Sequence, residues 1–439
     1  MKKSKFIKST IILIIGGALT KLLGMIIKIV MTRLLGTEGI GIYMLISPTF
    51  MLFIALAQLG LPVAISKLVA EDKSNNKNLV FSMIPFMFIF NIIIMVFLIF
   101  SSYYIANNLL HEPRSYYALI CIGIVLPLIS LSNLLRGYFF GKERMIPHVV
   151  SNITEDIIRL IVLIIGIPIF LTKGLEFAVA FVVLANIASE LTSILVLFFF
   201  LPKHFSITKK DLKPNKQSIK NVLSISIPTT GSRIIGSIGY FLEPIILTFV
   251  LLKIGYSNSF IVNQYGILNG YIMPLLLMPS FFTLAISQAL IPVISNAYSK
   301  GLVIYSKNKI KQAIILSLII GIPITIMLEL IPQIPLELVY GTTKGIEYLR
   351  VLAPIFLLYY IQTPLTSALQ AIGKAKEAMN GTLIGMVIRT SLLFICSLFH
   401  IGMWGLVIAT SVNIIVVTFH QAKHVKKAFS KKNSLKATF

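Results

Sequence analysis

The feature that most constrains this chain is a succession of long apolar segments separated by short connections. A transmembrane helix needs about 20 mainly apolar residues, and about twelve stretches qualify: residues 9–35, 40–66, 79–105, 115–138, 149–171, 175–201, 221–251, 265–297, 311–331, 348–371, 378–400 and 402–422. Of the 439 residues, 56% are hydrophobic and 12% are charged. Soluble globular proteins carry about 25% charged residues, roughly twice the share found here. A chain with so much apolar sequence cannot bury it all in a globular core. The sequence therefore predicts an all-α polytopic membrane protein.

The lysines and arginines are distributed unevenly between alternate connections. With a cytoplasmic N-terminus, 28 of the 39 Lys and Arg residues fall in cytoplasmic connections and termini, Arg136 included; 6 fall in outer connections and 5 within helices. Cytoplasmic loops are the ones that carry excess Lys and Arg. We expect a multi-pass protein of the bacterial cell membrane with both termini cytoplasmic. The net charge of +24 then reflects topology, and we expect no nucleic-acid partner.

Short patterns repeat between the two halves of the chain. Residues 58–66 read QLGLPVAIS and residues 288–295 read QALIPVIS, while TKLLG at 20–24 matches SRIIG at 232–236. Six helices per half, each half starting inside, imply a parallel repeat. The predicted architecture is two six-helix lobes around a V-shaped central cavity. Its parts are an N-terminal lobe (1–205), a basic cytoplasmic linker (206–220), a C-terminal lobe (221–422) and a basic cytoplasmic tail (423–439).

Five cations lie inside the predicted helices: Lys21, Lys28, Arg159, Arg233 and Arg389. A charge near the bilayer centre costs about 2.5–3.5 kcal/mol or more, so such residues usually face a bundle interior or a wet cavity. The two lysines are alternatively interfacial, with their amines reaching the headgroups, and Arg159 is alternatively paired with Glu155 or Asp156. Arg233 and Arg389 have no acid one turn away, so they need an anion from another helix or from a ligand.

Acidic residues and prolines inside the helices suggest coupling and movement. Glu190 and Glu243 are candidates for binding a coupling H⁺ or Na⁺, with interhelical salt bridges as the alternative. Five prolines are candidate hinges, with fixed curvature as the alternative: Pro48, Pro62, Pro244, Pro279 and Pro292.

Several kinds of chemistry find no support in the sequence. There is no Gly-rich loop ending in Lys-Ser/Thr to cradle phosphates, and the six histidines show no metal-ligand pairing, so we expect neither a cofactor nor a metal. The predicted outer connections hold no paired carboxylates, which a membrane glycosyltransferase would need. We therefore expect a transporter and not an enzyme.

Four segments resemble a known superfamily. Residues 21–50 read KLLGMIIKIVMTRLLGTEGIGIYMLISPTF and are followed by LAQLGLPVAISKLVAE. Residues 265–298 read YGILNGYIMPLLLMPSFFTLAISQALIPVISNAY, and residues 364–374 read PLTSALQAIGK. The chain resembles the multidrug/oligosaccharidyl-lipid/polysaccharide (MOP) flippase superfamily, in its polysaccharide transport and stage V sporulation protein B-like branch.

This resemblance implies a flippase, expected to be a monomer, that moves an undecaprenyl-pyrophosphate-linked sugar to the outer leaflet by alternating access. It implies a place in cell-wall or polysaccharide biosynthesis, or in sporulation. The residues implied to bind the pyrophosphate are Lys21, Lys28, Arg33 and Arg159, joined by Arg233, and Arg389 is the remaining cavity cation. Two alternatives stay open: a cation-coupled multidrug exporter of the same fold, and a membrane scaffold for wall synthesis.

Overall fold

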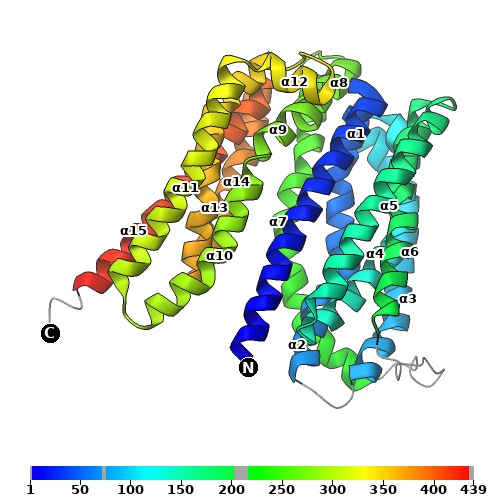
Figure 1. Cartoon of the computed structure of the whole chain (residues 1–439). Coiled ribbons are helices and arrows are strands. Elements are labelled where there is room, and N and C mark those ends of the chain that lie inside the picture. The colour runs from blue at the N-terminus through cyan, green and yellow to red at the C-terminus, as the bar shows by residue number, and fades with distance from the viewer. Residues whose placement is uncertain (1, 72–75, 202–215, 435–439) are drawn as a thin grey trace. The chain divides into compact units, whose positions relative to one another are not determined.

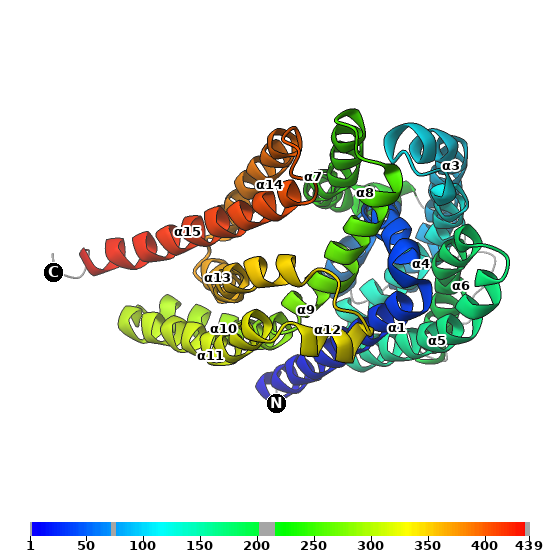
Figure 2. The same cartoon turned by 90° about the horizontal axis from the view of Figure 1, so that it is seen from above.

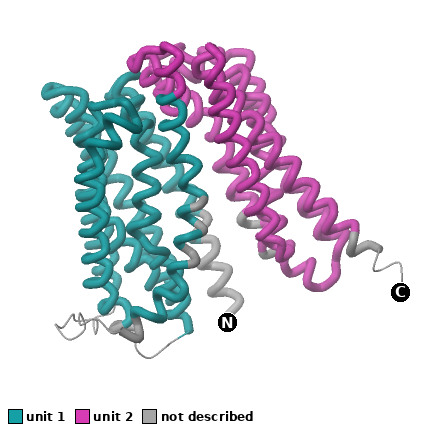
Figure 3. The backbone as a smooth tube through the Cα atoms, turned by 180° about the vertical axis from the view of Figure 1, so that it is seen from behind, with its two compact units in different colours: residues 1–249 teal, residues 250–439 magenta. Residues whose placement is uncertain are grey.

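The structure is a computed structural model that describes residues 2–71, 76–201 and 216–434. Every regular element in these ranges is helical, which confirms the predicted all-α class. The residues group into two compact units, 1–249 and 250–439 (Figure 3). The lobe boundaries expected from the sequence stay a prediction. Residues 206–215 of the expected linker and 435–439 of the expected tail lie outside the described residues.

The first unit is a bundle of long helices (Figure 1). Its elements are α1 (Lys2–Gln58), α2 (Leu61–Glu71), α3 (Asn76–Tyr104), the π-helix η1 (Ile105–Leu109), the 3₁₀ turn η2 (Pro113–Ser115), α4 (Tyr116–Gly141), α5 (Met145–Leu171), α6 (Leu175–Phe199) and α7 (Lys216–Lys253). Helix α4 packs against α2, α3, α6 and α1, and α5 packs against α1 and α6. The last four residues of α7 belong to the second unit.

A glycine divides the longest helix into two membrane crossings. Helix α1 has 57 residues, which at 1.5 Å per residue is about 85 Å, far more than the roughly 30 Å hydrocarbon core. Gly36 interrupts it with φ 69° and ψ −176°, a backbone region that only glycine enters easily. Gly36 lies between the predicted segments 9–35 and 40–66, so the two expected crossings are both present within α1.

The second crossing is itself broken near its end. Leu59 and Gly60 both have positive φ, at 46° and 60°, and α2 begins at the next residue. Pro62 lies in the first turn of α2, where its missing N–H leaves no hydrogen bond unmade. The buried face of α2, which includes Leu61 and Ile65, joins a core cluster with residues of α3, α4, α6 and α7.

The second unit contains the remaining helices: α8 (Asn258–Gly266), the π-helix η3 (Ile267–Ile272), α9 (Met273–Leu277), α10 (Ser280–Ser299), α11 (Val303–Leu330), α12 (Gln333–Tyr340), α13 (Ile346–Ala371), α14 (Ala375–Ser397) and α15 (Trp404–Ser434). Helix α13 packs against α10, α11 and α15, and α14 and α15 form an antiparallel hairpin, with α15 alongside α14 in the view from above (Figure 2). The hairpin closes through residues 398–403.

One predicted helix, 265–297, is wrong as a single element. The structure divides it among α8, η3, α9 and α10, with a break at residues 278–279. Pro279 has no N–H to continue the hydrogen-bond ladder, and it stands directly before α10. The Leu276 carbonyl, next to this break, accepts a hydrogen bond of 2.7 Å from the fully buried Tyr360 hydroxyl of α13.

Ten helices in the described part of the chain are long and apolar enough to cross a membrane. The first of these spans, Ile15–Glu71, contains both crossings divided by Gly36. Helix α5 has 27 residues, which is also sufficient length, but it carries Glu155, Asp156 and Arg159. These charges need partners within the bundle, because charged side chains are costly to expose to lipid.

Candidate functional site

A cluster of charged side chains lies between α4, α5 and α6 of the first unit. The Glu155 carboxylate accepts hydrogen bonds from two guanidinium groups, Arg136 on α4 through Oε2 and Arg159 on α5 through Oε1. Glu155 and Arg159 are one helical turn apart, a spacing that places both on one face. Asp156 adds a second acid, with its Oδ1 3.5 Å from Arg159 Nη1. Arg159 is therefore held in internal ion pairs, the alternative that the sequence had left open.

Arg136 extends this cluster to a third helix. Its Nη2 also donates to Ser193 Oγ of α6 at 2.7 Å, and the residue is only 9% exposed. The count of Lys and Arg residues assigned Arg136 to a cytoplasmic connection. This assignment is wrong, because α4 continues to Gly141 and Arg136 is a buried residue of that helix. Its position near the end of a predicted helix gave no sign of a partner 19 residues away.

Glu190 lies one turn before Ser193 on α6 and is 4% exposed. Its Oε2 has no hydrogen-bond partner among the described residues, whereas the carboxyl group as a whole has a hydrogen bond with the Ser132 side chain. Glu155, Arg136 and Arg159 also act on it electrostatically. An ionised carboxylate is expensive to bury, and more so when one of its oxygens has no hydrogen bond. Glu190, one of the expected coupling residues, therefore lies beside the charged cluster, and its role in coupling stays a prediction.

A small cavity of about 210 Å³ opens onto the same cluster. Its lining residues are Thr20 of α1, Arg136 of α4, and Asn152, Glu155 and Asp156 of α5. Such a space holds several water molecules, whose share of liquid volume is about 30 Å³ each. Because Thr20 lines it, the cavity extends from the cluster to the turn of α1 that also carries Lys21.

The cations predicted on α1 and α7 have a different environment from Arg159. Lys21, Arg33 and Arg233 are exposed, and Lys28 is partly buried. Arg233 Nη1 donates to Gln58 Oε1 at 3.4 Å, so the structure brings α7 to the end of α1. These side chains place positive charge on helices that otherwise consist largely of apolar residues.

The other predicted residues are more scattered. Arg389 belongs to the second unit, where its Nη2 donates to Thr410 Oγ1 of α15 at 3.4 Å. Glu243 of α7 is 5% exposed, in the first unit but outside the cavity lining given above. Of the candidate hinges, Pro48, Pro244 and Pro292 lie within helices, whereas Pro62 and Pro279 stand at the breaks. Their roles stay predictions.

The charges of the cluster nearly cancel. Two guanidiniums, Arg136 and Arg159, face Glu155 and Asp156, with Glu190 as a third acid nearby. An anionic ligand is attracted by cations that it can reach, and the exposed cations of α1 and α7 meet that condition better than the guanidiniums of the α4–α6 cluster. The exposed cations and the α4–α6 cluster therefore differ in net charge.

Comparison with known proteins places these features in context. The family model described as polysaccharide biosynthesis protein matches residues 6–298, and the MatE model matches residues 237–395. The chain is 36% identical to stage V sporulation protein B of Bacillus subtilis over 438 residues, covering 97% of this chain and 85% of that protein. It is 23% identical to lipid II flippase MurJ of the same organism, covering 88% and 76%.

Solved structures show the same fold. A multidrug resistance MATE family transporter of the MOP superfamily, in its inward-facing conformation, aligns with a TM-score of 0.72 at 18% identity, covering 94% of this chain and 96% of that one. A MOP superfamily transporter from Pyrococcus furiosus, described as having a binding pocket of reverse polarity, aligns with a TM-score of 0.61 at 18% identity, covering 98% and 96%.

Proposed function

This chain belongs to the polysaccharide biosynthesis protein family of the MOP superfamily, a family of membrane transporters, and we propose that it carries an anionic, lipid-linked oligosaccharide or cell-wall precursor between leaflets by alternating access. The substrate class expected is a sugar on an undecaprenyl-pyrophosphate carrier. The sequence-based expectation of a transporter, not an enzyme, agrees with this membership.

The observation that carries the proposal is the exposed positive charge on α1 and α7. Lys21, Arg33 and Arg233 are exposed on helices that otherwise consist largely of apolar residues, where facing the hydrocarbon would cost several kcal/mol. An anionic headgroup removes that cost, because ammonium and guanidinium groups form charge-assisted hydrogen bonds with phosphate oxygens. Lys28, seven residues after Lys21, lies on nearly the same face of α1.

The buried cluster supplies a second part of the mechanism. Glu190 can take up a proton or a cation, and its ionisation changes the charge felt by Arg136 and Arg159. Because Arg136 joins α4, α5 and α6 through Glu155 and Ser193, a change at Glu190 alters the contacts that hold three helices together. We propose this as the site where an H⁺ or Na⁺ gradient is coupled to transport, with Glu243 of α7 as a second coupling candidate.

One relative supports the substrate class. The 23% identical relative is described as a lipid II flippase, whereas the 36% identical relative is described only as a sporulation protein. We therefore expect the substrate of this chain to contain a polar sugar joined through phosphate to a polyprenyl tail.

Drug export is the second candidate function. It is favoured by the match of the MatE model to residues 237–395 and by the structural likeness to a multidrug transporter. However, Glu155 is already bound to Arg136 and Arg159 and so offers a cationic drug less negative charge. The sign of the exposed charge on α1 and α7 favours an anion.

The test is transport by the purified full chain in proteoliposomes. The probe is a fluorescent undecaprenyl-pyrophosphate-linked disaccharide, whose movement between leaflets is followed by its accessibility to a membrane-impermeant quencher. Loss of one charged hydrogen bond, worth about 1.5–3 kcal/mol, should lower transport by about tenfold or more in Arg233→Ala and Lys21→Ala. The matched control is Lys173→Ala, which removes an exposed cation from the connection between α5 and α6.

Two outcomes would overturn the proposal. One is no facilitated movement of the probe by wild-type protein that does export a cationic dye. The other is equal transport by the wild type, Arg233→Ala and Lys21→Ala. Movement of the probe with losses confined to the two site variants supports it.

A further inference from the structure

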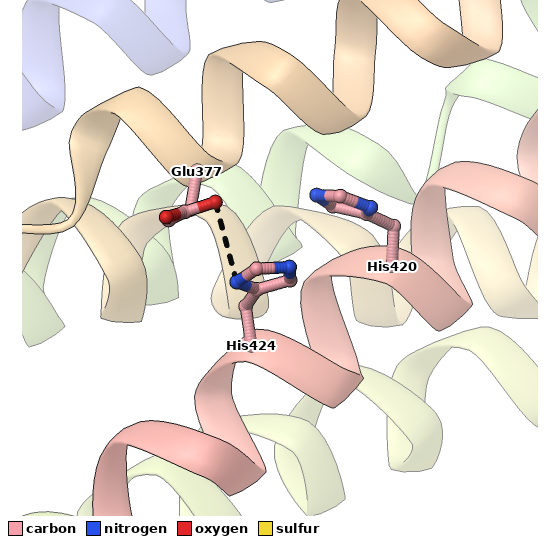
Figure 4. A group of neighbouring side chains, drawn as sticks. All are labelled: Glu377, His420 and His424. Atoms are coloured by element: carbon pink, nitrogen blue, oxygen red, sulfur yellow. Dashed lines mark ion pairs between the residues drawn. The ribbon is translucent and has the colours of Figure 1, made fainter.

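The second unit holds a group of side chains that the proposed function does not use. Glu377 of α14 and His420 and His424 of α15 converge at the open end of the α14–α15 hairpin (Figure 4). One ligand atom from each residue lies within 4.8 Å of the other two. Glu377 is in the first turn of α14, so the group lies opposite the connection at residues 398–403 that closes the hairpin.

The geometry is that of a site whose side chains already face each other. His424 Nδ1 lies 3.3 Å from Glu377 Oε2, and the two imidazole rings are stacked with centroids 4.4 Å apart. His420 Nε2 is buried and has no hydrogen-bond partner among the described residues. That nitrogen is one that a metal ion would satisfy.

The spacing of the two histidines suits metal binding as well. Residues four apart on a helix lie on the same face, and His-x-x-x-His on one helix is a recurring zinc-ligand arrangement. Two imidazoles and one carboxylate are a common three-residue ligand set for Zn²⁺, with a fourth position left for water. Mg²⁺ and Ca²⁺ prefer oxygen ligands, so the donor set favours a late first-row divalent ion.

The surroundings hold the ligands in place and leave an entry route. A Cβ added at Gly381 would lie 2.7 Å from His420 Cδ2, so the imidazole packs directly over the glycine. Gln421, between the two histidines, is fixed by a 2.9 Å hydrogen bond from Thr366 Oγ1 of α13. The side chains of His424 and Glu377 are 22% and 38% exposed, which lets an ion reach them from solvent.

Positive charge nearby sets a limit on affinity. Lys374 and Lys427 act electrostatically on His424, in opposition to Glu377. Lys427 is exposed and Lys374 is partly buried, so water and salt screen part of this repulsion. Glu377 is needed to offset it, and the site should lose most of its affinity when that carboxylate is neutralised.

We propose that Glu377, His420 and His424 bind a Zn²⁺-like divalent ion that joins α14 to α15 at the open end of their hairpin. The ion would make contacts with both helices that the apoprotein lacks, so it would restrain their separation. This site lies within one unit and is independent of the proposed substrate cations.

The experiment is direct titration of purified full-length protein, carrying a tag without histidines, with Co²⁺ as a spectroscopic probe and Zn²⁺ as competitor. One equivalent of Co²⁺ should give the intense visible absorption of a four-coordinate site, and Zn²⁺ should displace it. Because loss of an outer-shell partner alone costs about 10–100-fold in affinity, loss of a direct ligand in His420→Ala, His424→Ala or Glu377→Gln should cost at least tenfold.

Two further variants make the result independent of folding. Gly381→Ala keeps all three ligands but crowds His420, and should weaken binding. His400→Ala removes an exposed histidine outside the cluster and should leave binding unchanged. Absence of Co²⁺ binding in folded wild-type protein, or binding that survives all three ligand substitutions, would overturn the site. Neither result bears on transport of the lipid-linked probe.

Discussion

Glu155 is the carboxylate that contacts both guanidiniums of the buried cluster. It is 7% exposed and accepts from both Arg136 and Arg159. A buried charge that loses its counter-charge is strongly destabilising, whereas an exposed ion pair contributes little. At the scale of single residues, this carboxylate therefore decides whether α4, α5 and α6 can hold two guanidiniums within the membrane-spanning bundle.

Glu155→Gln should destabilise the protein by about 3–5 kcal/mol, because it leaves the buried Arg136 and the partly buried Arg159 with reduced compensation. The measurement is thermal unfolding of the purified protein in detergent. Glu71→Gln is the matched control, since it breaks the exposed Lys67–Glu71 pair, whose side chains are 57% and 59% exposed, and should cost less than about 1 kcal/mol. Equal unfolding temperatures for the two variants would contradict this account of Glu155.

At the scale of elements, the breaks between helices are the places where backbone hydrogen bonding has to be completed by other groups. Helix α1 turns at Gly36 and stops at Leu59–Gly60, and the α9–α10 junction stops at Pro279. Each break leaves backbone groups without helical partners, and in lipid such groups must be satisfied within the protein. The Tyr360 hydroxyl does this for Leu276, so α13 is tied to the α9–α10 break.

Gly36→Ala should lower the stability of the folded protein by about 1–3 kcal/mol, because the backbone at Gly36 lies in a region that side chains strongly disfavour. The readout is again the unfolding temperature, together with the yield of protein inserted in the membrane. Gly24→Ala provides the comparison. Gly24 is helical, and a Cβ there would meet nothing within 4 Å, so this variant should be neutral or stabilised by up to about 1 kcal/mol. A Gly36→Ala protein as stable as Gly24→Ala would be inconsistent with a strained kink.

At the scale of the whole molecule, the chain is a multi-pass MOP-superfamily transporter, and its orientation remains a prediction from the Lys and Arg counts. Lys344 and Lys376 flank opposite ends of α13, a 26-residue helix. At 1.5 Å per residue this helix is about 39 Å long, enough to separate the two positions by the full hydrocarbon core. They are therefore a suitable pair of reporters for orientation.

Single cysteines at these positions, Lys344→Cys and Lys376→Cys, should react differently in intact cells. With Cys121 and Cys396 replaced by alanine, a membrane-impermeant maleimide should label position 344 and leave position 376 unlabelled until the membrane is permeabilised. The reverse pattern would invert the topology and place both termini outside.

The amino-acid sequence alone determined the class of this protein and most of its crossings, because apolar length and the placement of Lys and Arg are local properties that lipid selects directly. Of the five prolines that it singled out, Pro62 and Pro279 stand at helix breaks, although 265–297 was taken as one helix. Arg159 and Glu155 were paired correctly as an alternative, since they are one turn apart on α5.

Only the tertiary structure decided which distant groups meet. Arg136 contacts Glu155 and Ser193 across three helices, and Glu377 meets His420 and His424 across the α14–α15 hairpin. The sequence analysis found no metal-ligand pairing among the histidines, because the acid partner of His420 and His424 lies on another helix. Which faces of two helices pack together depends on side-chain fit along their whole length, and no short pattern in the chain encodes it.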